Sequence, residues 1–328
     1  MFKTAFRAFR SRLLSPLLEK GSSCDRALLL QGRQACHVTR SLDYVDTLSD
    51  AEFGVYSQWG EDGILEWLIQ RLPISSKRFI EFGVQDYREA NTRFLLINRN
   101  WKGLIIDGSS DNMELVRKEE LYWRHDLTAV GAFIDRDNIA DLITTNGFAG
   151  PVGVLSVDID GNDYWVWEAI ECVNADIVVC EYNAVFGDLH PITIPYGQDF
   201  YRTAAHKSNL YFGASISAMR LLAKQKGYEL AGTNNAGSNA FFVRKDLFPL
   251  VESAIGCKEP CPSLARESRN EAGQLNHLSG LDRLREIADM PVVCIDTGRT
   301  TTLRALGSLY SDAWLDAMCV GQHSKVYG

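Results

Sequence analysis

Hydrophobic and polar residues follow a regular pattern from Tyr56 onward. After Ser57, the segment QWGEDGILEWLIQRL (58–72) has apolar residues at intervals of three and four. This spacing predicts an amphipathic helix with Ser57 as its N-cap and an end before Pro73. The segment RFIEFGV (78–84) is rich in apolar and aromatic residues, which predicts a strand. A helix is expected next, around 91–98.

The alternation of strands and helices continues to residue 248. The run VGVLSVDID (152–160) is apolar up to its acids, as in a central parallel strand. Further strands are expected over 104–108, 176–183, 228–232 and 239–248, with a strand-like LYWR at 121–124, and helices over 111–121, 133–146, 164–173 and 214–227. Repeated β/α units closed by a hairpin-like pair predict an α/β fold with a doubly wound, Rossmann-like sheet.

The chain is expected to divide into three parts: an N-terminal extension over 1–54, an α/β domain over 55–250, and a C-terminal extension over 251–328. Within residues 1–20, Phe and Leu recur at helical spacing among Arg and Lys. Such a segment fits a helix on an anionic membrane surface, a mitochondrial presequence, or a short helix packed on the body. No apolar run reaches the roughly 18 residues that a transmembrane helix needs.

Composition narrows the class of protein. The 328 residues are 46% hydrophobic and 23% charged, as in an ordinary soluble protein, and the net charge of −8 argues against a nucleic-acid binder. The eight cysteines are scattered, and Cys257 and Cys261 form the one close pair. A zinc site of this type needs a second pair, so we expect free thiols in a reducing compartment. The predicted location is the cytoplasm, with residues 1–20 as a candidate contact with the inner face of the membrane.

Polar residues follow each expected strand at its carboxyl end, where ligands bind in doubly wound sheets. A set of this kind, in order along the chain, is hard to explain by folding alone. The residues are Glu81, Gly83, Asp86, Asp107, Asp158, Asp160, Glu181 and Asn183.

These residues favour a nucleoside-containing ligand without phosphates. Gly83 lets a ligand approach the backbone, and Asp107 follows it at about the spacing at which a carboxylate binds ribose hydroxyls. A dinucleotide site needs G-x-G-x-x-G, but the turn here is GVQDYR and lacks the later glycines. NAD and FAD are therefore disfavoured, and S-adenosylmethionine is the expected cofactor.

Five segments together resemble the FkbM-type methyltransferases and their relatives from bacterial polysaccharide clusters. The segments, spread over about 55–246, are YSQWGEDGIL, FIEFGVQDYREANTRFLL, WKGLIIDGSS, LSVDIDGNDYWVWEAI and VVCEYN. The resemblance implies the class I methyltransferase fold, S-adenosylmethionine as cofactor, and methylation of sugar oxygens. Asp160 stands where the family often has Glu, and the segment after Asn183 matches no family pattern, so the acceptor is not identified.

The resemblance also implies roles for single residues. Glu81 and Gly83 are expected at the methionine part of the cofactor, Asp107 at the ribose, His125 with Asp126 at the adenine, and Asp158 beneath the methionine amino group. Ser57 and Gln58 match the opening motif, for which a helix N-terminus over the cofactor and a simple cap are equally good explanations. The expected cofactor contacts are Ser57, Gln58, Glu81, Gly83, Val84, Asn91, Asp107, Asp126 and Asp158.

Methyl transfer to a hydroxyl needs a base, for which the sequence offers Glu181, His190 and Asp160. Glu181 ends a rigid strand, whereas His190 lies in a His-Pro turn, where a purely structural role is the simpler explanation. A divalent cation is a second route: Asp158, Asp160 and Glu181 are hard oxygen ligands of the kind that Mg²⁺ binds.

The leading hypothesis is thus an S-adenosylmethionine-dependent O-methyltransferase that acts on a sugar hydroxyl of a polysaccharide, glycolipid or sugar-bearing metabolite. The alternative is a non-catalytic binding or scaffold protein that keeps the methyltransferase fold. Cofactor binding separates the first hypothesis from an inert scaffold.

Overall fold

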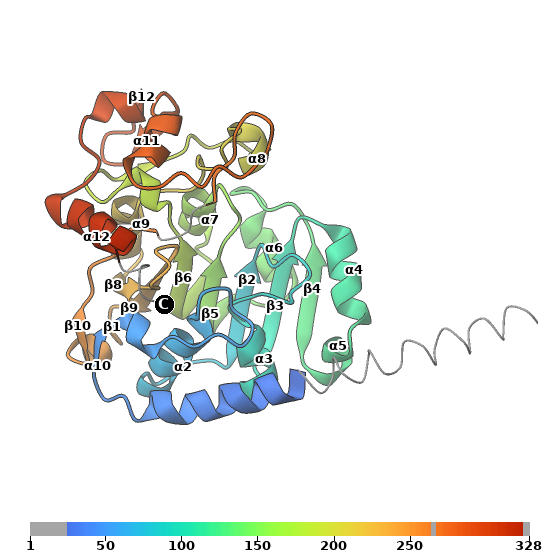
Figure 1. Cartoon of the computed structure of the whole chain (residues 1–328). Coiled ribbons are helices and arrows are strands. Elements are labelled where there is room, and N and C mark those ends of the chain that lie inside the picture. The colour runs from blue at the N-terminus through green and yellow to red at the C-terminus, as the bar shows by residue number, and fades with distance from the viewer. Residues whose placement is uncertain (1–24, 264–266, 324–328) are drawn as a thin grey trace, which may run out of the picture.

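The computed structural model describes residues 25–263 and 267–323. Its centre is a seven-stranded sheet (Figure 1) with the order β4 (Leu127–Gly131), β3 (Lys102–Asp107), β2 (Arg78–Phe82), β5 (Gly150–Val157), β6 (Val173–Glu181), β9 (Asn239–Arg244) and β8 (Tyr228–Thr233). All strands are parallel except β9, which runs antiparallel to both of its neighbours. This order, with one reversed strand beside the edge, is the sheet of class I methyltransferases, and the predicted fold class is confirmed.

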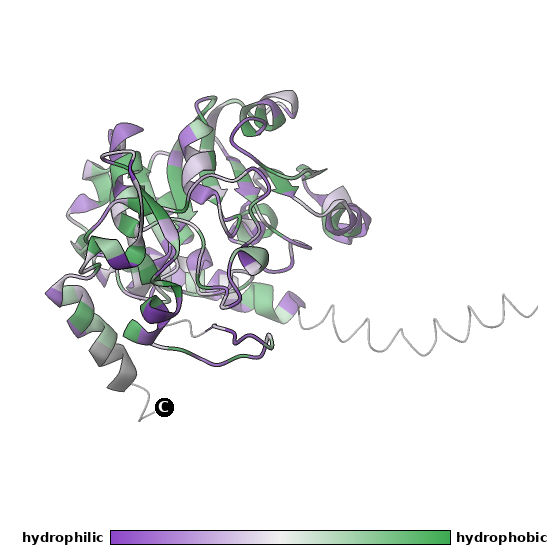
Figure 2. Ribbon diagram, turned by 90° about the horizontal axis from the view of Figure 1, so that it is seen from above, coloured by the Kyte–Doolittle hydropathy of each residue, from purple (hydrophilic) through white to green (hydrophobic). Residues whose placement is uncertain are grey.

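Both faces of the sheet are buried, so its strands are apolar on both sides. Alternate residues of one strand enter different cores: Phe79 packs with one set of helices and Ile80 with the other. The first face is covered by α2 (Glu61–Arg71), α3 (Arg93–Arg99) and α4 (Ser110–Lys118), and the second by α6 (Ile139–Thr145), α7 (Asp163–Ala169) and α9 (Ile216–Gln225). Figure 2 shows the hydrophobic strands between helices that carry their polar residues outward.

The segments before and after the α/β domain pair with it or with each other. A helix over 25–40 lies along the lower edge in Figure 1. Strand β1 (Val45–Thr47) pairs with β10 (Ile255–Cys257), and β7 (Ile192–Thr193) pairs with β11 (Pro291–Cys294), which pairs with β12 (Thr300–Thr302). The remaining helices are α5 (Glu120–Arg124), α8 (Arg202–Ala205), α10 (Pro249–Glu252), α11 (Leu281–Ile287), α12 (Asp312–His323) and the 3-10 turns η1 (Leu48–Ala51), η2 (Ala184–Phe186) and η3 (Leu303–Leu306).

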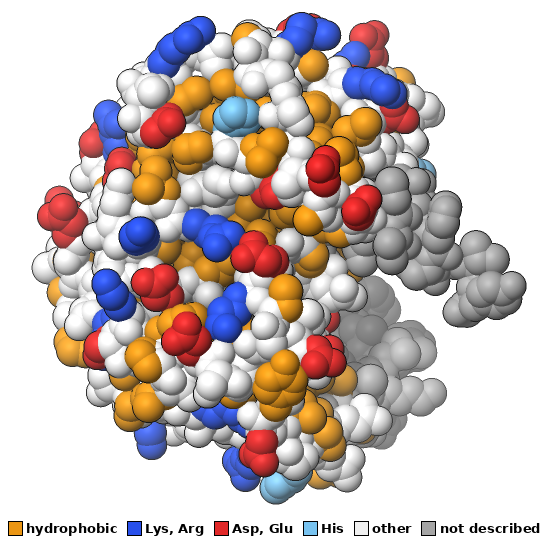
Figure 3. All heavy atoms as spheres, turned by 90° about the vertical axis from the view of Figure 1, so that its left-hand side faces the viewer, with side chains coloured by type: hydrophobic (Ala, Val, Ile, Leu, Met, Phe, Trp, Pro, Cys, Tyr) orange, Lys and Arg blue, Asp and Glu red, His pale blue; other side chains and the backbone are white. Residues whose placement is uncertain are grey.

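Within the described ranges, no helix combines the length and apolarity required to cross a bilayer. The basic segment over 1–20 lies outside these ranges, and the boundaries at 54 and 250 stay predictions. On the face shown in Figure 3, acidic and basic side chains are interspersed among apolar ones.

Three expected elements differ from the structure. LYWR forms helix α5 rather than a strand, and β4 is the next segment, LTAVG. Trp123 is 72% exposed, which a strand buried on both faces does not allow. The helix expected over 133–146 begins only at Ile139. Helix α2 begins at Glu61, because Gly60 adopts the left-handed conformation with φ of 103° and breaks the helix after Ser57.

Gly83, directly after β2, has a φ of 71° and lies against the end of β5. A Cβ atom here would be 1.8 Å from the carbonyl oxygen of Asp158, so the adjacent backbone itself excludes any side chain. The glycine is therefore required by the contact between two strand ends. The sequence had suggested that it makes room for a ligand, which this contact neither requires nor excludes.

We predict that Gly83→Ala destabilises the fold much more than Gly147→Ala. Gly147 has a similar φ of 75°, but its added Cβ would meet nothing within 4 Å. The control therefore measures the backbone strain alone, of order 1–2 kcal/mol, whereas Gly83→Ala adds a steric overlap that costs roughly another 1–3 kcal/mol. Urea unfolding of both variants measures the difference, and equal losses would contradict the close contact.

Candidate functional site

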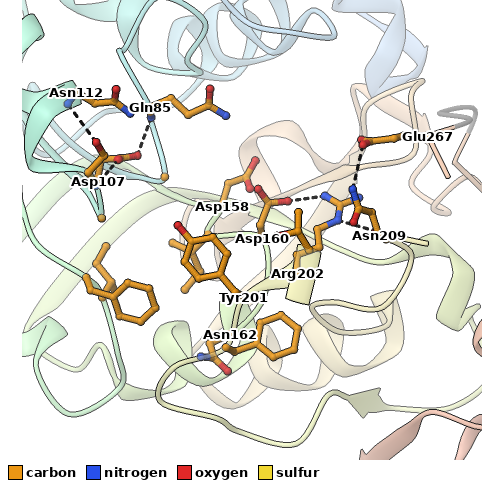
Figure 4. A pocket seen from close by; sticks show the side chains of 18 residues that line it. Gln85, Asp107, Asn112, Asp158, Asp160, Asn162, Tyr201, Arg202, Asn209 and Glu267 are labelled. Atoms are coloured by element: carbon orange, nitrogen blue, oxygen red, sulfur yellow. Dashed lines mark hydrogen bonds and ion pairs between the residues drawn. The ribbon is translucent and has the colours of Figure 1, made fainter. Parts of the chain in front are cut away.

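A pocket of about 420 Å³ lies at the carboxyl ends of β2, β3 and β5, which form the upper edge of the sheet in Figure 1. Figure 4 shows Asp107 and Gln85 at one end, Asp158, Asp160 and Arg202 at the other, and Tyr201 between them. The lining residues come mainly from these strand ends, from the segment after β4 and from the start of α8, with others from α4 and from two loops; they include Gly83, Gln85, Asp107, Ser109, Asn112, Phe133, Ile134, Asp158, Asp160, Asn162, Tyr201, Arg202, Asn209 and Glu267.

Asp107 is held by the backbone at the end of β3. Its Oδ2 atom accepts a hydrogen bond from the amide of Gln85 at 2.7 Å, and its Oδ1 atom accepts one from the amide of Ser109 at 2.8 Å. A carboxylate has about four acceptor sites, so both oxygens keep acceptor capacity. Asp107 is thus a fixed acceptor for a pair of neighbouring hydroxyl groups.

Two aromatic rings stand in the same pocket. Phe133 and Tyr201 stack with their centroids 6.3 Å apart and their planes 18° from parallel. They are 43% and 63% exposed, which is unusual for large apolar rings. They offer a flat apolar surface to a planar ring of a ligand.

Asp163, at the start of α7, shapes the loop after β5. Its side chain is fully buried and accepts hydrogen bonds from the amides of Ile159 at 2.8 Å and Gly161 at 2.9 Å. Both oxygens are thereby used to fix the loop that carries Asp158 and Asp160. Asp163 has the structural role that a carboxylate at a helix start is expected to have.

Three carboxylates converge where β5 and β6 end: oxygens of Asp158, Asp163 and Glu181 all lie within 4.8 Å of one another. Burial raises the pKa of Asp158 and of Glu181 well above the usual range, and the charges of neighbouring acids raise both further. Burial also raises the pKa of Asp163 to about 6. The Oε2 atom of Glu181 is buried without a hydrogen-bond partner among the described residues.

Arg202 is the cation nearest to these acids. Its guanidinium pairs with Asp160, donates to the carbonyl of Asn209 at 2.7 Å, and lies 3.8 Å from the ring centroid of Phe212. Its charge lowers the pKa of both Asp158 and Glu181, against the larger effect of burial. The cluster is therefore partly neutralised from within the chain.

A second pocket, of about 250 Å³, adjoins the first, because Arg202 and Glu267 line both. Its remaining wall comes from distant parts of the chain: Gln58, Trp59, Glu181, Tyr182, Asn183, Ala184, Phe212, Gly237, Ser238, Ser263 and Arg283. The carboxylates of Asp158 and Glu181 thus lie where the two pockets meet.

Asp62 places the N-terminal part of this wall. One of its oxygens accepts hydrogen bonds from the amides of residues 55, 56 and 57, at 2.7, 2.7 and 3.0 Å. The hydroxyl of Ser57 accepts in return from the amide of Asp62 at 3.0 Å. This exchange bends the chain so that Gln58 and Trp59 border the second pocket. Gly60, not Ser57 as expected, is the N-cap residue of α2; Ser57 binds the amide of Asp62 within the helix, and it does not line either pocket.

Three further expected cofactor contacts lie behind the pocket wall. Glu81 accepts hydrogen bonds from the amides of Asn91 and Thr92 at 2.8 and 3.0 Å, and burial raises its pKa to about 7 against these bonds. The side chain of Asn91 donates to Ser156 at 3.2 Å, and Val84 belongs to a hydrophobic core. These residues support the loop after β2, and none of them lines either pocket.

Two expected site residues lie elsewhere in the fold. Asp126 precedes β4 at the opposite edge of the sheet, where its 65% exposed side chain pairs with Lys102 at 3.3 Å. Asp126 was expected at the adenine because LYWR (121–124) resembled a strand that would end at the pocket, whereas this segment is a helix. His190 interacts through Nε2 with the carbonyl of Ser308 at 3.0 Å and lines neither pocket. A structural role in the turn is what its contacts support.

Several lining residues were not expected from the sequence. Phe133 and Ile134 were assigned to a helix, although their place directly after an apolar strand is a usable signal. Arg202, Glu267 and Arg283 come from segments without a strand pattern, and only the fold brings them to the pockets.

No protein-family model matches the chain, and no curated protein does so either. Solved structures with a similar fold include the N-terminal domain of EvdMO1 with S-adenosylhomocysteine bound, which is 10% identical, covers 64% of this chain and 94% of its own, and has a TM-score of 0.38. The O-methyltransferase TomG from Streptomyces achromogenes, in complex with S-adenosylmethionine, is 15% identical over 66% and 89% of the two chains, with a TM-score of 0.37. An O-methyltransferase from Bacillus cereus is 11% identical over 66% and 89%, with a TM-score of 0.35. At this level of similarity they assign neither a family nor a ligand to this chain.

Proposed function

We propose that this chain is an S-adenosylmethionine-dependent O-methyltransferase of the FkbM type whose acceptor is a sugar hydroxyl. The observation that carries the proposal is the meeting of two pockets at Asp158 and Glu181. The first pocket has a hydrogen-bond acceptor for the ribose hydroxyls and a flat apolar surface for the base, as a nucleoside needs. The second brings a carboxylate with a raised pKa to the same junction.

The charges of the first pocket suit this cofactor better than a dinucleotide. Asp107, Asp158 and Asp160 line it, and its one arginine is already paired with Asp160. A pyrophosphate would be repelled there, because it needs amide donors or free cations. An amino acid and a nucleoside joined through a sulfonium carry positive charge instead. Asp107 would hold the ribose, Phe133 and Tyr201 the adenine, and Asp158 the methionine ammonium.

Glu181 is the residue that we propose as general base. When bound, S-adenosylmethionine supplies a methyl group on a positively charged sulfur, which needs no further activation. The chain has to hold the acceptor oxygen in line with that methyl group and accept the hydroxyl proton. Glu181 has a free buried oxygen for this proton, whereas Asp160 is engaged by Arg202. A carboxyl with a raised pKa is the stronger base once ionised.

The second pocket has features of a carbohydrate site. Trp59 is 43% exposed on its wall and can cover the apolar face of a sugar ring. Polar side chains such as Gln58 and Asn183 surround it. These groups support a sugar unit as acceptor, which is free or part of a polysaccharide, glycolipid or metabolite. We further propose a cytoplasmic protein with a peripheral membrane contact through residues 1–20.

Binding without transfer is the competing function. A scaffold protein with this fold has no use for an unpartnered carboxylate buried at the junction of two pockets, because burying it costs free energy. A chain that binds S-adenosylhomocysteine but never turns over any sugar would support the scaffold instead.

Asp107→Ala is expected to weaken binding of S-adenosylhomocysteine by roughly tenfold to a hundredfold, since it removes charge-assisted hydrogen bonds worth about 1.5–3 kcal/mol. Asp126→Ala is the matched control: this acid is exposed at the opposite edge of the sheet, and its loss should leave binding unchanged. Isothermal titration calorimetry on both variants measures this. Equal affinities for the two variants would remove the ribose assignment.

Glu181→Gln is expected to lower kcat about a hundredfold or more, with little change in affinity for S-adenosylhomocysteine. Because the pKa of Glu181 is raised, wild-type activity should fall as the pH decreases through that pKa and the base gains its proton. The variant should lose this acidic limb. The assay is formation of S-adenosylhomocysteine with an acceptor that the wild type methylates. An unaltered pH profile in the variant would exclude Glu181 as base.

The sequence offered Asp158, Asp160 and Glu181 as ligands of a divalent cation. In the structure, Arg202 already supplies the positive charge beside these acids. Asp160 is paired with Arg202, and the third acid at the junction is Asp163, whose two oxygens already accept backbone hydrogen bonds. Arg202 supplies positive charge beside the remaining acids. We therefore propose transfer without a metal ion.

Full activity is thus expected to remain after exhaustive dialysis against EDTA, with no gain on addition of Mg²⁺ or Mn²⁺. The measurement is the initial rate before chelation, after it, and after each metal is returned. A loss that Mg²⁺ restores would show that the acids hold a cation after all.

A further inference from the structure

Arg283, in the second pocket, has no counter-ion among the described residues. It lies on α11, in the part of the chain after residue 250, and lines the pocket that also contains Glu181. Its Nε atom is buried and has no hydrogen-bond partner, and no ion pair of the described residues includes it. Burial lowers its pKa to about 10, so the side chain stays charged at neutral pH.

Three acids near Arg283 are paired with other cations. On the same helix, Asp282 pairs with Arg285 at 2.6 Å, and Glu286 pairs with Lys207 at 3.5 Å. Across the pocket, Glu267 pairs with Arg269 at 3.5 Å. Glu181, the other carboxylate of this pocket, forms no ion pair with Arg283 among the described residues.

An unpaired guanidinium of this kind is costly to the fold. A buried donor without a partner destabilises the folded state, and more so when it is charged. The positive charge of Arg202 on the same pocket lowers the pKa of Arg283 further. A residue that serves folding alone would be expected to find a partner, so the missing partner points to a ligand.

On the basis of the proposed function, we propose that Arg283 binds an anionic group of the acceptor, so that the methylated sugar carries a carboxylate or a phosphate. A guanidinium presents paired N–H donors in one plane, which match the two oxygens of either group. The small pocket of about 250 Å³ suits a single sugar unit. Trp59 would cover its ring, Glu181 would face the hydroxyl that is methylated, and Arg283 would hold the charged substituent.

The test uses the full chain saturated with S-adenosylhomocysteine and three probes: D-glucuronate, inorganic phosphate and neutral D-glucose, at constant ionic strength. Saturable rises of the melting temperature are expected with glucuronate or phosphate, and none with glucose. Whether glucuronate or phosphate raises the melting temperature shows whether the pocket recognises a carboxylate or a phosphate. If all three probes act alike on the wild type, the proposal is overturned.

Variants test whether Arg283 is responsible for the rise in melting temperature. Arg283→Gln should abolish it, and without probes its melting temperature should equal or exceed that of the wild type, because a half-buried charge without a counter-ion is removed. Arg285→Gln is the matched control, since Arg285 lies on the same helix, is exposed and pairs with Asp282; it should keep the response. Phosphate stabilises proteins in general, so a rise that persists in Arg283→Gln counts against the proposal.

Arg283→Lys tests the same role of Arg283 with a smaller change to the folded protein. It keeps the charge but loses the paired donors, and we expect about tenfold weaker anion binding in a folded protein. Wild-type affinity in this variant would contradict recognition by the guanidinium. Calorimetry with S-adenosylhomocysteine separates the two proposals: if that ligand fails to bind, the methyltransferase function fails, whereas cofactor binding without an anion response removes only the subsite.

Discussion

Gly83 passes so close to the carbonyl oxygen of Asp158 that a side-chain carbon would lie 1.8 Å from it. This contact joins the carboxyl ends of β2 and β5 at the middle of the sheet, where the strand order reverses. Such a reversal is where doubly wound sheets bind ligands. The turn after Gly83 then gives an amide to Asp107, and the loop after Asp158 carries Asp160. The close approach of the two backbones therefore fixes the relative position of two segments that line the pocket.

The close approach of strand ends also determines the charges of the site. Strands β5 and β6 end side by side, so Asp158 and Glu181 share a buried space with Asp163. Burial raises the pKa values of Asp158 and Glu181, and the like charges that share this space raise them further. Arg202 offsets part of the repulsion from a loop outside the sheet. An arriving cation would offset the rest, which is why we propose a sulfonium ligand for this site and Glu181 as the base.

The sequence predicted the parts of the site that strand periodicity controls. Asp107 and Asp158 follow apolar runs, and the carboxyl ends of parallel strands meet at one edge, so their side chains could be placed from the pattern alone. Strand boundaries were harder to predict. LYWR resembled a strand, so Asp126 was expected at the carboxyl edge of the sheet, but LYWR is helical and Asp126 lies at the opposite edge. Arg202 and Arg283 were out of reach, because they come from loops and short helices whose position depends on tertiary packing rather than on local periodicity.

A structure of the full chain with S-adenosylhomocysteine tests the central claim most directly. The account predicts the ribose hydroxyls within hydrogen-bond distance of Asp107, the adenine beside Phe133 and Tyr201, the amino group at Asp158, and the sulfur facing the second pocket and Glu181. Absence of binding at saturating ligand, or a ligand bound away from the ends of β2, β3 and β5, would contradict it.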